Sequence, residues 1–121
     1  MLVLTFAVSG AGNCVRVAGA PYVYARSRFG SFVLPARCPH RGGPLHLGVF
    51  EPDRPRLVCP WHERASSVTR AITAGVPVVR NGNRATAVFP HPPGTPHELT
   101  HLPLSPDLGG THPEERPCAQ R

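Results

Sequence analysis

Two short stretches decide the fold of this chain. Residues 38–46 read Cys-Pro-His-Arg-Gly-Gly-Pro-Leu-His, and residues 59–62 read Cys-Pro-Trp-His. Each stretch offers a thiol with an imidazole two or three residues later, so two loops can bind one metal centre from opposite sides. Four cysteines in a small chain also suggest disulfides, but the adjacent histidines favour metal. A set of two cysteines and two histidines suits zinc or the iron of an iron–sulfur cluster. The candidate ligands are therefore Cys38, His40, Cys59 and His62.

These stretches resemble the binding motif of Rieske iron–sulfur proteins, and more narrowly that of soluble Rieske-type ferredoxins and oxygenase domains. The flanking residues 21–26 and 30–37 resemble the strands that lead into the first loop. Residues 76–79 and the Asn81-Gly82 pair look like the closing strands. The resemblance covers about residues 1–89, and it implies a Rieske domain whose cluster-binding subdomain is formed by two loops.

The resemblance also implies a role for each candidate ligand. Cys38 and Cys59 would bind one iron of a [2Fe–2S] cluster, and His40 and His62 would bind the other, nearer the surface. Two neutral imidazoles in place of two thiolates raise the potential to roughly −150 to +300 mV. The implied partners are a flavin-dependent reductase and a terminal oxygenase or similar redox enzyme.

Two departures from the family pattern matter. The respiratory-chain branch has an extra cysteine in each loop, and here those positions look like Gly43 and Trp61. This favours the soluble, lower-potential branch. After the last ligand, Glu63 occupies a position where family members commonly have a small residue. Some members also have a hydroxyl group near this point that tunes the cluster, and here Ser66 or Ser67 is the candidate to replace it.

The rest of the domain is predicted to be all-β. Sixteen Pro and 12 Gly in 121 residues exclude a helical bundle. The Asn81-Gly82 pair between apolar runs predicts a hairpin, and no helical periodicity stands out. We expect a small antiparallel sandwich or barrel with two irregular loops, 38–48 and 59–75. Seven apolar runs have strand length: Leu2–Val8, Cys14–Val17, Tyr22–Ala25, Phe32–Leu34, Arg56–Val58, Val76–Val79 and Ala85–Phe89.

Composition changes at Pro90. Residues 90–121 contain eight Pro and no Val, Ile, Phe or Trp, so they bury little apolar surface. The sequence therefore predicts a Rieske domain over 1–89 and a Pro- and His-rich tail over 90–121. The tail is either disordered or strapped over the domain by Leu99, Leu102 and Leu104, and we expect it to be dispensable for the cluster.

Charge and hydropathy restrict the partners. The formal net charge is +6 and all 13 basic residues are Arg. They are scattered without aromatic interleaving, so we predict no nucleic-acid role. Arg41 and Arg64 flank the histidine ligands and predict a positive docking face. The apolar run at residues 1–8 is too short for a bilayer span, so we expect no membrane partner and a cytoplasmic location.

The other cysteines and histidines have ordinary interpretations. Cys14 is expected to be a buried thiol, and His46 a solvated loop residue. Trp61 is expected to shield the cluster by packing. The tail residues have no regular metal-ligand spacing, and they are His91, His97, His101, His112 and Cys118.

Three functions remain. The first is a ferredoxin that carries single electrons between a reductase and an oxygenase or related enzyme. The second is a small Rieske subunit of a larger oxidoreductase, as in nitrite reductases. The third is a zinc-stabilised, non-redox interaction module. A terminal oxygenase needs a further iron site, which is formed by two histidines and a carboxylate. The chain has only two aspartates, Asp53 and Asp107, that could supply an aspartate ligand to such a site. We therefore expect an electron-transfer component rather than a stand-alone enzyme.

Overall fold

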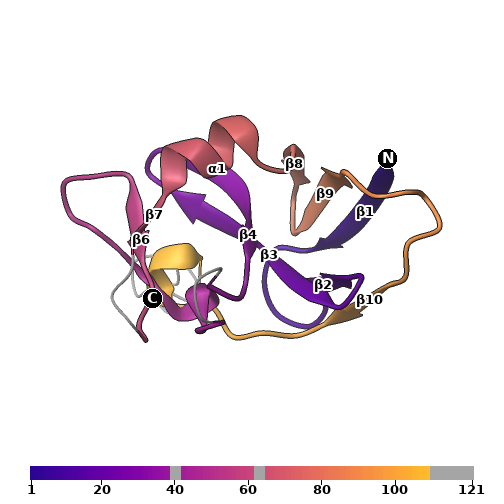
Figure 1. Ribbon diagram of the computed structural model, residues 1–121, viewed down its shortest axis with the longest axis horizontal. Helices are drawn as coiled ribbons and strands as arrows, with labels where there is room; N and C mark the ends of the chain where they lie inside the picture. The colour runs from indigo at the N-terminus through magenta and orange to yellow at the C-terminus, as the bar shows by residue number, and fades with distance from the viewer. Residues whose placement is uncertain (39–41, 62–64, 110–121) are drawn as a thin grey trace, which may run out of the picture.

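The described part of the chain consists mostly of short antiparallel strands. The structure is a computed structural model that describes residues 1–38, 42–61 and 65–109. Figure 1 shows two halves joined by the long strands β3 (Ala20–Ser27) and β4 (Gly30–Pro35). The remaining elements, in chain order, are β1 (Leu2–Ala7), β2 (Cys14–Val17), η1 (Leu45–Leu47), β5 (Val49–Phe50), β6 (Arg56–Val58), β7 (Ala65–Ser67), α1 (Val68–Ala74), β8 (Val78–Asn81), β9 (Arg84–Phe89), β10 (His97–Thr100) and η2 (Pro106–Leu108).

The strands form three antiparallel sheets. Their orders are β1-β9-β8, β10-β2-β3-β4 and β5-β6-β7. The predicted all-β, antiparallel fold is confirmed, and each of the seven predicted strands is present. The predicted hairpin is also present between β8 and β9, although its two loop residues are Gly82 and Asn83. Gly82 has a φ of 64°, which its missing Cβ permits.

Alternation of buried and more exposed residues along most of β1 and β9 builds the first core. Leu2, Leu4 and Phe6 are buried on β1, and Ala85, Ala87 and Phe89 are buried opposite them on β9. On the outer face Thr5 and Thr86 pair through their hydroxyls at 2.9 Å. This period of two is what places one face of a strand in the core.

A second core lies between the β3–β4 hairpin, the β5-β6-β7 sheet and α1. Its members include Val23, Phe32, Leu57 and Val68. The sequence did not predict α1, which has seven residues and buries only Val68, too little for a visible period. Its N-terminus is capped by Ser67, whose hydroxyl accepts a hydrogen bond from the Arg70 N–H at 3.1 Å.

Residues 97–109, here called the C-terminal strap, lie on both halves of the molecule. β10 pairs with β2, and the chain then runs back along the domain to η2, which contacts β3 and β5 (Figure 1). Leu99 is 52% exposed, Leu102 and Leu104 are partly buried, and Leu108 is fully buried in the second core.

The strap changes one expectation drawn from the sequence. The boundary after residue 89 stays a prediction, but the burial of Leu108 argues against a tail that is dispensable for the cluster. We now expect loss of residues 90–109 to destabilise the second core.

Among the described residues, no helix has the length and apolar character needed to cross a bilayer.

Candidate metal centre

The two candidate cysteines enter one core from two different sheets. Cys38 follows β4 and Cys59 follows β6, and both thiols belong to the second core. Cys38 is 4% exposed and Cys59 is fully buried. Both are free cysteines in the structure. The other two predicted ligands, His40 and His62, lie outside the described residues, as do Arg41, Arg64 and Glu63.

The first loop is a closed turn. The Cys38 N–H donates to the Gly43 carbonyl, and the Gly42 N–H donates to the Cys38 carbonyl, both at 2.8 Å. Gly42 has a φ of 72°, and a bridge between Arg37 and Pro44 closes the base of the turn. These bonds hold the backbone around Cys38 in a defined position.

Gly43 brings the first loop against the second. A Cβ at this position would lie 2.9 Å from the Cys59 Sγ and 3.1 Å from the Cβ and Cγ of Trp61. Only a residue without a side chain fits such an approach. The backbone of the loop that begins at Cys38 therefore lies directly against the thiol of Cys59.

This arrangement fits an iron–sulfur centre. Two cysteines from separate loops are buried together in an apolar core, and thiolates are the protein ligands of such clusters. Within 1–38, 42–61 and 65–109, no three His, Cys, Asp or Glu side chains lie close enough to hold a metal. The two other predicted ligands, His40 and His62, lie outside these ranges.

Trp61 borders this site on its open side. Its side chain is 61% exposed, and it has an interaction partner within the structure. Trp61 also lines a small pocket of about 230 Å³, together with Arg16, Arg37, Gly42 and His46. The face beside the two cysteines therefore combines an exposed aromatic ring with two guanidinium groups.

His46 is tied to the backbone around it. Its Nδ1 lies 3.1 Å from the Ala36 carbonyl, and its own carbonyl accepts a hydrogen bond from the Ser105 N–H at 3.0 Å. The ring is partly buried rather than fully solvated as the sequence suggested.

Cys14 is a buried thiol, as predicted. It is fully buried on β2. Burial raises the pKa of its thiol, while a backbone hydrogen bond at Tyr22 and the charge of Arg16 oppose this less strongly. Because the thiolate is the metal-binding form, this environment disfavours Cys14 as a ligand.

The tail histidines that the structure describes, His91, His97 and His101, form no metal-binding group with other described residues. His97 lies on β10 with its Nδ1 3.0 Å from the Thr95 carbonyl, and His91 packs near Phe89. His101 lines a different pocket, described below. His112 and Cys118 lie outside the described residues.

Sequence reasoning missed the residues that support the end of the first loop. The Ser105 hydroxyl donates to the Gly48 carbonyl at 2.6 Å, and the Asp107 carboxylate accepts from the Phe50 N–H at 2.9 Å. A signal was present, because Ser105-Pro106 has the form of a helix start with Pro in its first turn. The Pro-rich composition around it masked that signal.

Comparison with known proteins identifies the family. The family model for the Rieske [2Fe–2S] domain matches residues 6–90, which is more than two thirds of the chain. A human protein described as "Rieske domain-containing protein" is 62% identical over 29 residues, a segment that covers 22% of this chain and 18% of the human protein. No solved structure matches significantly. This chain belongs to the Rieske [2Fe–2S] domain family and binds a [2Fe–2S] cluster.

Proposed function

We propose that this chain is a Rieske-type ferredoxin that carries single electrons between a reductase and an oxygenase or related oxidoreductase. Membership of the Rieske family implies electron transfer by a [2Fe–2S] cluster. One observation supports the proposal most directly. Cys38 and Cys59 are buried in one core, and Gly43 lies against the Cys59 Sγ.

In this proposal the ligands divide by residue type. Cys38 and Cys59 would hold one iron as thiolates, and His40 and His62 would hold the other. When bound, the cluster supplies one-electron chemistry at a potential of roughly −150 to +300 mV. The second core excludes water from the thiolate side, because both cysteines are nearly inaccessible.

Cluster analysis of cysteine variants tests the ligand assignment. The protein purified without oxygen should contain iron and acid-labile sulfide in equal amounts. Cys38→Ser and Cys59→Ser should lose both. Cys14→Ala is the matched control, since Cys14 is equally buried, and it should keep its cluster. Zinc without sulfide would instead support a non-redox interaction module.

The partners are proposed from charge. Arg16 and Arg37 line the pocket beside Trp61, and the chain carries a net charge of +6. A partner with an acidic face, such as a flavin-dependent reductase, would be steered toward this surface. We propose no nucleic-acid partner and no membrane partner, and a cytoplasmic location remains part of the proposal.

Salt dependence tests the carrier role. Reduction by the cognate reductase, followed by stopped flow, should slow as salt shortens the screening length to roughly 8 Å at physiological ionic strength. Arg37→Glu should slow it further, whereas Arg54→Glu in the distant exposed loop should have little effect. Rates indifferent to both salt and Arg37→Glu would favour a permanently bound subunit of a larger oxidoreductase, as in nitrite reductases.

A further inference from the structure

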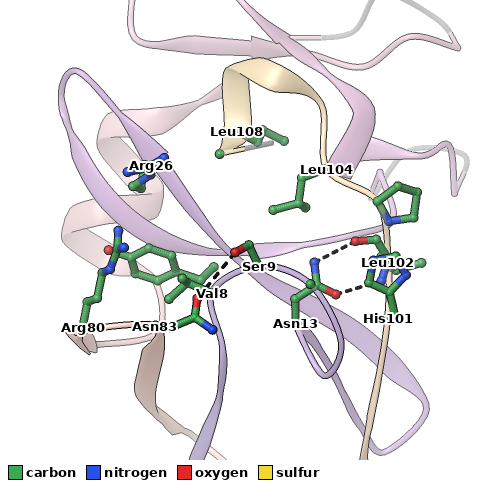
Figure 2. A pocket seen from close by; sticks show the side chains of 14 residues that line it. Val8, Ser9, Asn13, Arg26, Arg80, Asn83, His101, Leu102, Leu104 and Leu108 are labelled. Carbon is green, nitrogen blue, oxygen red and sulfur yellow. Dashed lines mark hydrogen bonds between the residues drawn. The ribbon is translucent and has the colours of Figure 1, made fainter. Parts of the chain in front are cut away.

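A further pocket lies away from the cysteine loops. It has a volume of about 570 Å³. It opens between the β1–β2 turn, the β8–β9 hairpin and the C-terminal strap (Figure 2). None of its lining residues belongs to loop 38–48 or loop 59–75. The Rieske site therefore does not explain it.

The lining of this pocket is basic and lacks an acidic side chain. It includes Arg26, Arg80 and His101, and no Asp or Glu. The nearest acidic residues in the strap bind elsewhere. Glu98 pairs with Arg16 at 3.8 Å, and Asp107 accepts from the Phe50 N–H. Neither of these two strap carboxylates lines the pocket, and both have other partners.

Arg80 lines the pocket, and two contacts orient its side chain. Its Nε donates to the Gly82 carbonyl at 2.7 Å, and its Cζ lies 5.9 Å from the centre of the Tyr24 ring. It forms no ion pair within the described ranges. A guanidinium that is already oriented loses little entropy on binding, and its planar fork matches a carboxylate or phosphate.

Asn83 adds a neutral donor beside this guanidinium. The Ser9 hydroxyl donates to the Asn83 Oδ1 at 3.5 Å, which turns the amide nitrogen away from Ser9 (Figure 2). Arg26 also lines the pocket but already has an interaction partner, so Arg80 is the guanidinium on which the site depends. Leu104 and Leu108 line another part of the wall. The pocket therefore has a basic end and an apolar end.

We propose that this pocket binds a small organic anion. Its carboxylate or phosphate group would bind Arg80 and Asn83, and its apolar part would contact Leu104. The strap forms one wall, and Ser105 within the strap donates hydrogen bonds to the carbonyls of His46 and Gly48 at the end of the first loop. An anion in the pocket would therefore stabilise the segment that supports that loop.

Titration of the cluster-loaded protein tests this site. Inorganic phosphate and succinate serve as separate probes, with chloride at matched ionic strength as the baseline. Amide NMR signals of Ser9, Asn83 and residues 101–104 should shift and saturate. Binding should weaken about tenfold or more in Arg80→Gln, since an ionic hydrogen bond is lost. Arg54→Gln, a change at an exposed arginine outside the pocket, should bind as the wild type does.

A second variant and a second readout complete the test. In Asn83→Asp the new residue is one that is common in turns, so the hairpin should be kept. Its carboxylate should repel the bound anion and abolish binding. The bound probe should also slow thermal bleaching of the cluster in the wild type and not in Asn83→Asp. Response to one probe alone supports the site and identifies the head group. No saturable shift with either probe, or equal responses in all three variants, would overturn the proposal.

Discussion

Gly43→Ala tests the close approach of the two cysteine loops. The added Cβ would lie 2.9 Å from the Cys59 Sγ and 3.1 Å from Trp61. Carbon atoms prefer separations of roughly 3.5–4.0 Å, and sulfur is larger, so the overlap is at least about 0.6 Å. Extra atoms in a packed core cost about 1–3 kcal/mol. The contact is relieved only if Cys59 or the first loop moves, and both hold proposed ligands.

Two other glycines, the adjacent Gly42 and the remote Gly94, provide controls for this variant. At Gly94 a Cβ meets nothing within 4 Å, so Gly94→Ala should be neutral. At Gly42 a Cβ also meets nothing, but the φ of 72° should cost about 1–2 kcal/mol. Iron and sulfide content, visible circular dichroism and urea unfolding should be measured for all three. We expect Gly42→Ala to lose stability while keeping its cluster, and Gly43→Ala to lose cluster as well.

The result that refutes this reasoning is specific. If Gly43→Ala matched Gly94→Ala in cluster content, spectrum and unfolding midpoint, the loops would not be in contact as the structure has them. Loss of stability with an unchanged cluster in Gly43→Ala would show that the contact is real but lies outside the metal centre.

Three further predictions concern the support of the fold. Leu108→Ala should cost about 2–5 kcal/mol of unfolding free energy because Leu108 is fully buried, whereas Leu99→Ala at a half-exposed position should cost little, as urea titration would show. Asn13→Ala should cost about 1–3 kcal/mol, because its amide exchanges hydrogen bonds of 2.7 and 2.9 Å with the Leu102 backbone; a cost no larger than that of Leu99→Ala would contradict it. Burial raises the pKa of the Cys14 thiol in the folded protein, so as the pH rises above about 8.5 the thiol ionises first in the unfolded chain. The free energy of unfolding should therefore fall above this pH in the wild type, and fall less in Cys14→Ala. If the free energy of unfolding depended on pH in the same way in both proteins, unfolding would not change the pKa of the Cys14 thiol.

Local signals explain how much of this molecule could be predicted from the sequence. Along most of β1 and β9, buried residues alternate with exposed or half-buried ones, so their period is visible. The Asn81-Gly82 pair is a strong local signal for a hairpin, which is present one residue further along, with Gly82 and Asn83 in its loop. The two cysteine motifs carry their chemistry in their residue types and spacing, and the family model that matches residues 6–90 agrees with them.

The missed elements depend on partners distant in the chain. β10 exposes all four of its residues and is a strand only because β2 offers it an edge. Asn13 and Leu102 are 89 residues apart in the chain, and neither residue type predicts the hydrogen bonds between them. Helix α1 is two turns long and is fixed by its Ser67 cap and by packing on β4. Such elements follow from tertiary contacts rather than from local propensity.

The burial of Leu108 beside the cysteine loops sets an order of events during synthesis. The ribosome makes Cys38 and Cys59 first and Leu108 about 50 residues later, an interval of roughly 2–10 s at the usual elongation rate of about 5–20 residues per second. During that interval the thiols emerge in a nascent chain whose second core lacks one of its fully buried members. The thiols of Cys38 and Cys59 are therefore more accessible to iron and sulfide before Leu108 is translated than they are in the folded chain.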